Sequence, residues 1–106
     1  MARTTPQPGE SAELRRLRQR IDALDRRIVR LLNDRATLAR DVGRAKASAG
    51  RHQIRDLARE KEVLLRVAMA NAGPMAQADL LALYRRLFTA TRAIEERDRR
   101  GEAADD

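Results

Sequence analysis

Residues 11–48, SAELRRLRQRIDALDRRIVRLLNDRATLARDVGRAKAS, decide the fold. No proline interrupts this stretch, and its apolar residues recur at alternating steps of three and four. That spacing is typical of a long amphipathic helix of the coiled-coil kind. The apolar positions are Leu14, Leu17, Ile21, Leu24, Ile28, Leu31, Leu38, Val42 and Ala45. We expect one helix from an N-cap at Ser11 to about Ser48, with Gly50 as its C-terminal stop.

Two shorter helices follow the long one. The second is predicted to begin near Asp56 and to stop before Gly73-Pro74. The third is predicted to begin near Ala76 and to fade over residues 97–101. Neither segment has the alternating pattern of a strand, so the sequence predicts an all-α fold of three helices with a very long first helix.

The chain length of 106 residues indicates one domain. We expect residues 1–10, which hold two prolines and a glycine, to form a disordered leader. Residues 11–101 would form the helical domain, and residues 102–106 an acidic tail.

Composition limits the partners and the compartment. The net charge of +7 permits nucleic-acid binding, but 16 acidic residues are interleaved with the basic ones and only two residues are aromatic, so we expect no nucleic acid as the main partner. No apolar run approaches the length of a membrane span, so we expect no membrane partner. The lack of cysteine and of an apolar secretory signal favours the cytoplasm.

The length of the first helix predicts a second copy of the chain. About 38 residues span roughly 57 Å at the rise of an α-helix. A compact monomer of this size has a radius of gyration of only about 13 Å. Two short helices cannot cover so long an apolar stripe, and we therefore expect a second copy of the chain to cover it in a dimer or a higher oligomer.

Polar residues interrupt the apolar face of all three helices. The heptad pattern assigns Arg35 to the seam, and Lys46 lies eleven residues later on the same face. Glu60 lies within the apolar stripe of the second helix, while Thr91 and Glu95 continue the apolar line of the third. A single buried arginine is often a structural ion pair or snorkels to solvent. Together these residues predict a polar pocket walled by helices.

This pocket offers cations and hydrogen-bond donors but no evident nucleophile. The only histidine, His52, lies in a predicted loop, and no Glu-x-x-His pair is present, so a metal site is not expected. There is neither a glycine-rich phosphate loop nor a serine-centred elbow.

Five motifs along the three helices form one larger pattern. They are Leu17-Arg18-x-x-Ile21-Asp22-x-Leu24-Asp25, Leu31-Leu32-x-x-Arg35, Val42-Gly43-Arg44-Ala45-Lys46, Arg55-Asp56-x-x-Arg59-Glu60 and Leu87-Phe88-x-x-Thr91-x-x-x-Glu95. This pattern resembles the all-helical chorismate mutases, and the resemblance covers roughly residues 14–97. It implies an intertwined dimer with two equivalent sites that converts chorismate to prephenate by a Claisen rearrangement without a cofactor, in phenylalanine and tyrosine biosynthesis.

The resemblance also implies a role for each site residue. Arg35 and Arg59 would contact the substrate carboxylates together with Thr91, and Arg18 would reach them from the first helix of the second chain. Lys46 and Glu95 would flank the ether oxygen, and Asp56 and Glu60 would hold the ring hydroxyl. The catalytic group is thus Arg35, Lys46 and Glu95, and the substrate-binding group is Arg18, Asp56, Arg59, Glu60 and Thr91.

Two residues depart from the common family pattern. Glu95 stands where many relatives have glutamine, and it should act as a neutral acid because a carboxylate would repel the developing oxyanion. Burial would raise the pKa of Glu95 while Lys46 would lower it. Thr91 replaces a serine found in some members.

Three alternatives stay open from the sequence. The first is another pericyclic enzyme on the same scaffold, either an isochorismate pyruvate lyase or a 4-amino-4-deoxychorismate mutase. The second is a basic helical DNA-binding or scaffolding dimer that treats Arg35 as a structural charge. The third is a non-catalytic regulatory module that associates with another enzyme of the shikimate pathway.

Overall fold

A computed structural model of the chain describes residue 9 and residues 11–101. The three helices are α1 (Ala12–Ser48), α2 (Leu57–Ala70) and α3 (Gln77–Arg99), and no strand is present within these described ranges. The predicted all-α class, the three helices and the very long first helix are therefore confirmed. The leader over residues 1–10, apart from Gly9, and the tail over residues 102–106 lie outside the described residues.

The chain divides into two compact units, and the boundary falls within α1. The N-terminal unit ends at Arg35, and its described helix is the first part of α1. The C-terminal unit begins at Ala36 and contains the end of α1 together with α2 and α3. The domain boundaries drawn from the sequence stay a prediction.

The ends of α1 follow from local hydrogen bonding. Ser11 Oγ accepts a hydrogen bond from the backbone N–H of Leu14 at 3.1 Å, which is the N-cap that the sequence predicts. At the other end Gly50 takes a positive φ of 81° that other residues rarely adopt. The Gly50 N–H bonds to Ala47 O at 3.0 Å and the Arg51 N–H to Lys46 O at 2.8 Å, which is the hydrogen-bond pair of a Schellman stop.

The second helix begins where its capping carboxylate lies. Asp56 is the N-cap of α2, and its side chain accepts from the backbone N–H of Arg59 at 3.0 Å. A cap of this kind stabilises a helix by about 1 kcal/mol, because it satisfies one of the free N–H groups of the first turn. The predicted boundaries of α2 and α3 are confirmed to within a residue or two.

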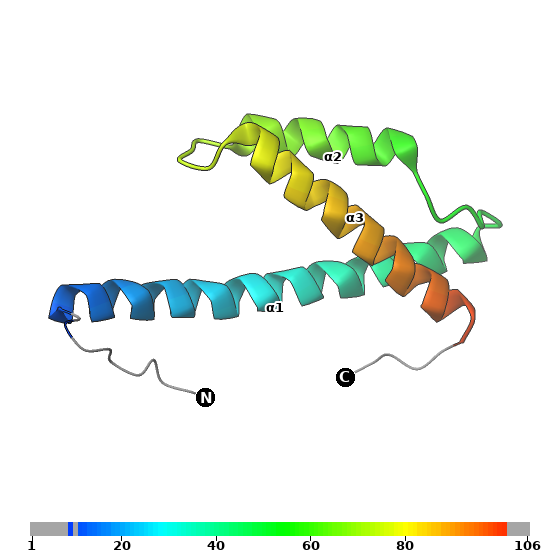
Figure 1. The fold of residues 1–106 in the computed structure, drawn as a ribbon. Helices are drawn as coiled ribbons and strands as arrows, with labels where there is room; N and C mark the ends of the chain where they lie inside the picture. The colour runs from blue at the N-terminus through cyan, green and yellow to red at the C-terminus, as the bar shows by residue number, and fades with distance from the viewer. Residues whose placement is uncertain (1–8, 10, 102–106) are drawn as a thin grey trace. The chain divides into compact units, whose positions relative to one another are not determined.

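Within the C-terminal unit, α2 and α3 pack against each other and are joined by residues 71–76 (Figure 1). Phe88 is the one buried large apolar side chain among the described residues, at 6% exposure. Its ring meets that of Tyr84 edge-to-face, with centroids 6.2 Å apart and planes at 73°. A core this small gives the unit little apolar burial of its own.

The end of α1 contacts α3 through two features in the same unit (Figure 1). Gly43 is buried, and Glu95 lies against it, because a Cβ placed on Gly43 would be in ordinary van der Waals contact with Glu95 Oε2 at 3.6 Å. Beside it in α1, Arg44 Nε and Nη2 donate to the two oxygens of Asp98 at 3.0 and 2.6 Å. This paired geometry is a bidentate contact between the two helices.

The apolar stripe of α1 is exposed along its length. Leu17, Leu31 and Leu38 expose 46%, 60% and 65% of their surface. The other exposed members of the stripe are Leu14, Ile21, Leu24, Ile28 and Val42.

Candidate functional site

Glu95 and Lys46 form the electrostatic centre of the candidate site. Glu95 lies on α3 against Gly43, and Lys46 lies in the last turn of α1. Burial raises the pKa of Glu95 above its ordinary value, and the positive charges of Lys46, Arg99 and Arg92 oppose that rise without cancelling it. The pKa of Glu95 therefore lies above its ordinary value, because the effect of burial exceeds that of the neighbouring positive charges.

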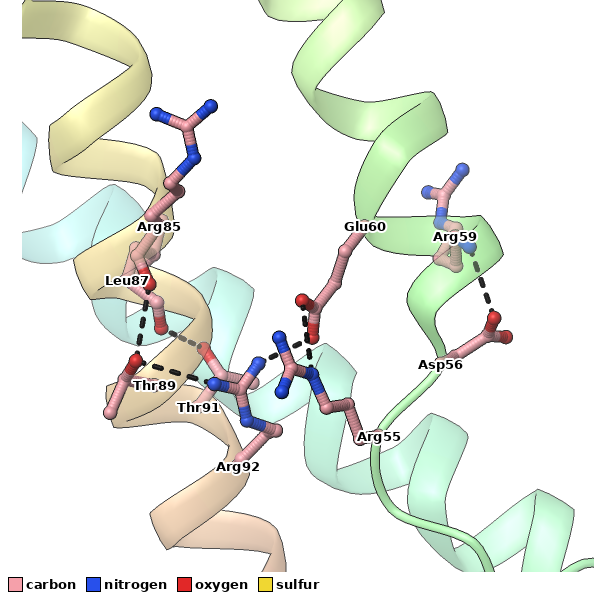
Figure 2. Close-up of polar contacts among 9 residues, drawn as sticks. All are labelled: Arg55, Asp56, Arg59, Glu60, Arg85, Leu87, Thr89, Thr91 and Arg92. Carbon is pink, nitrogen blue, oxygen red and sulfur yellow. Dashed lines mark hydrogen bonds and ion pairs between the residues drawn. The ribbon is translucent and has the colours of Figure 1, made fainter.

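Glu60 on α2 is held by two arginines (Figure 2). Arg92 Nη1, from α3, donates to Glu60 Oε2, and Arg55 Nε lies 3.6 Å from Glu60 Oε1. The side chains of Glu60 and Arg92 are only 18% and 24% exposed, whereas that of Arg55 is 57% exposed. The pair between Glu60 and Arg92 is thus the one partly shielded from solvent.

Asp56 and Arg59 are joined through the α2 N-terminus. The Asp56 carboxylate accepts the backbone N–H of Arg59, as described above, while the Arg59 guanidinium donates to Glu62 at 2.7 Å. The side chains of Arg59 and Glu62 are 56% and 48% exposed. Water competes with an exposed pair of this kind, so it contributes little to stability and exchanges partners readily.

Thr91 is one of the few buried residues, at 7% exposure. Its hydroxyl donates to the backbone carbonyl of Leu87 at 2.9 Å, one turn earlier in α3. This bond satisfies the hydroxyl within the helix and leaves the oxygen lone pairs as acceptors.

The predicted site residues are divided between the two units. Lys46, Asp56, Arg59, Glu60, Thr91 and Glu95 all lie in the C-terminal unit. Arg18 and Arg35 lie in the N-terminal unit, where both side chains are half-buried.

Two hollows on the C-terminal unit are lined by residues of the predicted site. Lys46 and Asp56 line a hollow of about 400 Å³ together with Arg55 and His52. Glu95 lines a second hollow of about 470 Å³ with Gly43 and Arg99 among its neighbours. The structure thus brings Lys46 and Asp56 together, and the positive charge of Lys46 also acts on Glu95.

Arg92 is the site residue that the sequence reasoning missed. Its guanidinium bonds to Glu60, and its charge also acts on Glu95, so it connects two of the predicted residues. Its position in the sequence could have indicated a place in the site. Arg92 adjoins Thr91 and precedes Glu95 by three residues, so it lies on a neighbouring line of the same helix face. Its partner on α2 depends on how two helices pack, which spacing along one helix does not reveal.

Two further findings concern metal binding and membrane spans in the described part of the chain. Among residues 9 and 11–101 there is no group of three or more His, Cys, Asp or Glu side chains able to bind a metal ion. None of the three helices combines the length and apolar character that a membrane span requires.

Comparison with known proteins relates the chain to the type II chorismate mutases, whose family model matches residues 17–96. The chain is 35% identical over 89 residues to a bifunctional chorismate mutase/prephenate dehydratase of Aquifex aeolicus, covering 80% of this chain and 24% of that protein. It is 32% identical over 92 residues to the enzyme of the same name from Stutzerimonas stutzeri, covering 83% of this chain and 25% of that protein. The chain thus spans about a quarter of the length of these curated relatives.

Solved structures agree with this placement. A chorismate mutase structure from Thermus thermophilus superimposes with a TM-score of 0.76 at 32% identity, over 80% of this chain and 96% of that one. A second form from the same organism gives a TM-score of 0.71 at 30% identity, over 74% of this chain and 98% of that one. The family match reaches from α1 through α3 and contains all eight predicted site residues as well as Arg92. The chain belongs to the chorismate mutase type II family.

Proposed function

We propose that this chain is a chorismate mutase, which converts chorismate to prephenate without a cofactor and serves phenylalanine and tyrosine biosynthesis. The single observation that carries the proposal is the placement of Glu95. Its carboxyl group lies against Gly43 of α1, within the field of Lys46, and burial raises its pKa. A family member with this arrangement has an acid and a cation available for the oxygen that gains charge in the reaction.

The chemistry makes modest demands on the protein. In the Claisen rearrangement one ether C–O bond breaks while one C–C bond forms within the same molecule, so no proton shuttle or covalent intermediate is needed. Catalysis then depends on holding the substrate dianion in its compact reactive conformer. It also depends on fixed positive charge and hydrogen-bond donors at the ether oxygen, which becomes negative in the transition state. Lys46 supplies the charge, and protonated Glu95 supplies the donor.

The remaining residues would anchor the substrate. Arg35 and Arg59 bind the carboxylates, because a guanidinium offers two parallel donors to a carboxylate. Arg59 is free to do so after exchanging its exposed partner Glu62 for the substrate. Thr91 adds a contact from α3, with its hydroxyl turned from the Leu87 carbonyl toward the ligand. Asp56 and Glu60 face the ring hydroxyl.

A second copy of the chain would complete the site. The exposed apolar stripe of α1 supports a homodimer, because unpaired leucine and isoleucine side chains over so many turns are costly in water. Arg18 of that second copy would reach the substrate carboxylates. We assign the dimer to the cytoplasm, which a chain without cysteine fits, and association with another enzyme of the shikimate pathway is part of the proposal.

The deciding experiment mixes purified protein with chorismate and, in a separate reaction, with isochorismate, and it assays loss of each substrate together with prephenate and pyruvate. We expect prephenate to accumulate in step with chorismate loss. Pyruvate from isochorismate, with chorismate untouched, would assign the chain to the lyase instead. No turnover of either substrate, together with DNA binding that weakens steeply with salt, would favour the binding-protein alternative.

A further inference from the structure

Arg92, which has no role in the function proposed above, is held by hydrogen bonds to two side chains (Figure 2). Its Nη1 donates to Glu60 Oε2, and its Nη2 lies 3.3 Å from Thr89 Oγ1. The Thr89 hydroxyl donates in turn to the backbone carbonyl of Arg85 at 3.2 Å, so its lone pair faces Arg92. Bonds to two different helices leave the Arg92 guanidinium little freedom to move.

We propose that Arg92 is a specificity-determining residue, which makes the Glu60 end of the site accept a ring hydroxyl and reject a ring ammonium group. The inference rests on the proposed function, in which Asp56 and Glu60 face the substituent of the substrate ring. Chorismate carries a hydroxyl at that position, and 4-amino-4-deoxychorismate carries an ammonium group. The two carboxylates alone would tolerate either substituent.

The charge balance around Glu60 gives the direction of the effect. Two carboxylates, Asp56 and Glu60, would attract an ammonium group strongly if they stood alone. Arg55 and Arg92 bring two positive charges to Glu60, and Lys46 adds another beside Asp56, so no net negative charge remains before any substrate enters. An ammonium substituent would therefore meet a like charge without a net attraction, whereas a hydroxyl donates its hydrogen bond to a carboxylate regardless.

Arg92 carries more of this effect than Arg55. Its side chain is 24% exposed against 57% for Arg55, and water and salt screen a partly buried charge less than an exposed one. Arg92 also contributes to the opposing charges that limit the rise in the pKa of Glu95. Removing its charge should consequently move two observables together, the choice of substrate and the pH dependence of the reaction.

The test compares kcat/KM for chorismate and for 4-amino-4-deoxychorismate in the wild-type chain and in Arg92→Gln and Arg92→Lys. Gln keeps a polar side chain without the charge, and Lys keeps the charge without the paired donors. We expect Arg92→Gln to raise the ratio of amino to hydroxy substrate by about tenfold, and Arg92→Lys to stay near the wild-type ratio. The pH at which activity towards chorismate has fallen by half should rise in Arg92→Gln only.

The matched control is Arg85→Gln, seven residues earlier on α3. Its guanidinium points away from Glu60 in Figure 2, so the substitution removes one positive charge from the same helix without touching the pair. We expect it to leave the substrate ratio and the pH midpoint unchanged. Circular dichroism and thermal unfolding of every variant separate an altered site from an altered fold.

The outcomes distinguish this inference from the function on which it rests. Wild-type conversion of chorismate with an unchanged ratio in folded Arg92→Gln overturns the role of Arg92 alone. An equal change in Arg85→Gln would overturn it as well, because the effect would then be one of net charge. Failure of the wild-type chain to convert either substrate would overturn the proposed function first and this inference with it.

Discussion

The two units of the chain differ in what their side chains contact. In the N-terminal unit none of residues 11–35 is buried, although this part of α1 carries most of the apolar stripe. The C-terminal unit buries Gly43, Phe88 and Thr91 and joins its helices by the ion pairs of Glu60 with Arg92 and of Asp98 with Arg44. The second unit is held by its own contacts, whereas the first is an amphipathic helix whose apolar face is uncovered.

This contrast indicates that the two parts of α1 are stabilised in different ways. Most of the stability of an amphipathic helix comes from packing of its apolar face rather than from intrinsic propensity. The N-terminal unit should therefore depend on a second chain, and any substrate contact made by Arg18 would depend on that chain too. The C-terminal unit should keep its Glu60 and Glu95 arrangement with or without a partner.

The largest expected effect comes from substituting the two arginines of the N-terminal unit, each in a separate variant. Arg18→Ala and Arg35→Ala should each lower kcat/KM for chorismate by about 10³-fold, because each removes a charged anchor of the dianion. If Arg18 serves the site of the second chain, a mixture of the two variants contains dimers with one intact site. Steady-state assays of an equal, re-equilibrated mixture should then recover about a quarter of the wild-type activity.

The mixing experiment carries its own control. The same two variants assayed separately, at the total concentration of the mixture, should stay inactive. A mixture no more active than its components would mean that Arg18 and Arg35 serve the site of the same chain. The N-terminal unit would then not contribute a residue to the site of a second chain.

The next effect concerns assembly. Leu24→Lys places a charge in the stripe, and twofold symmetry would repeat it on both copies. Burial of one leucine contributes about 2 kcal/mol, so we expect the dimer dissociation constant to rise at least about 100-fold in analytical ultracentrifugation, with activity lost in proportion. Met69→Lys in α2, where the side chain is 79% exposed, is the matched control and should leave assembly unchanged. A monomeric Leu24→Lys with full activity would contradict the shared site.

A smaller effect is expected in the C-terminal unit from the protonation of Glu95. Burial raises its pKa above the ordinary 4.5, and the neutral form is the one that can donate to the ether oxygen. Activity should be full below that pKa and decline as the pH rises through it, because the acid is then converted to a carboxylate. Glu95→Gln should flatten the profile of kcat against pH. An unchanged profile in Glu95→Gln would show that another group titrates.

The sequence was informative where structure is decided locally. The Ser11 cap and the Gly50 stop each depend on a few neighbouring residues, and both are confirmed. The predicted start of the second helix near Asp56 is confirmed as well. The polar lines on α1, α2 and α3 also follow from helical periodicity, which places Lys46, Glu60 and Glu95 before any contact is known.

What the sequence could not provide is the pairing of long side chains across helices. Arg92 binds Glu60 of α2 rather than Glu96 of its own helix, and the Arg59 guanidinium binds Glu62. Such choices depend on the distance between packed helices and on a flexible side chain with several charged neighbours. The net direction of the Glu95 pKa likewise required the burial of that one carboxyl group, since a neighbouring lysine alone would lower it.

The smallest expected effect lies where α1 touches α3. Gly43 is the only buried residue of α1, all of which the structure describes, and a Cβ there would make ordinary van der Waals contact, 3.6 Å from Glu95 Oε2. Gly43→Ala should therefore stabilise the chain by up to about 1 kcal/mol, because alanine favours the helix over the flexible unfolded chain. Thermal unfolding should show a midpoint higher by a few degrees, roughly as expected for a domain of this size.

The same methyl group would also cover one side of the Glu95 carboxyl group. Removing water from that side disfavours the charged form, so the decline in activity with pH should move to slightly higher pH in Gly43→Ala. Gly43→Ser is the useful comparison, because its hydroxyl can donate to the carboxylate and should move the decline to lower pH. If both variants shift the midpoint in the same direction, Glu95 does not lie against α1 in the active enzyme, and its hydrogen-bonding role at the ether oxygen would have to be assigned to another side chain.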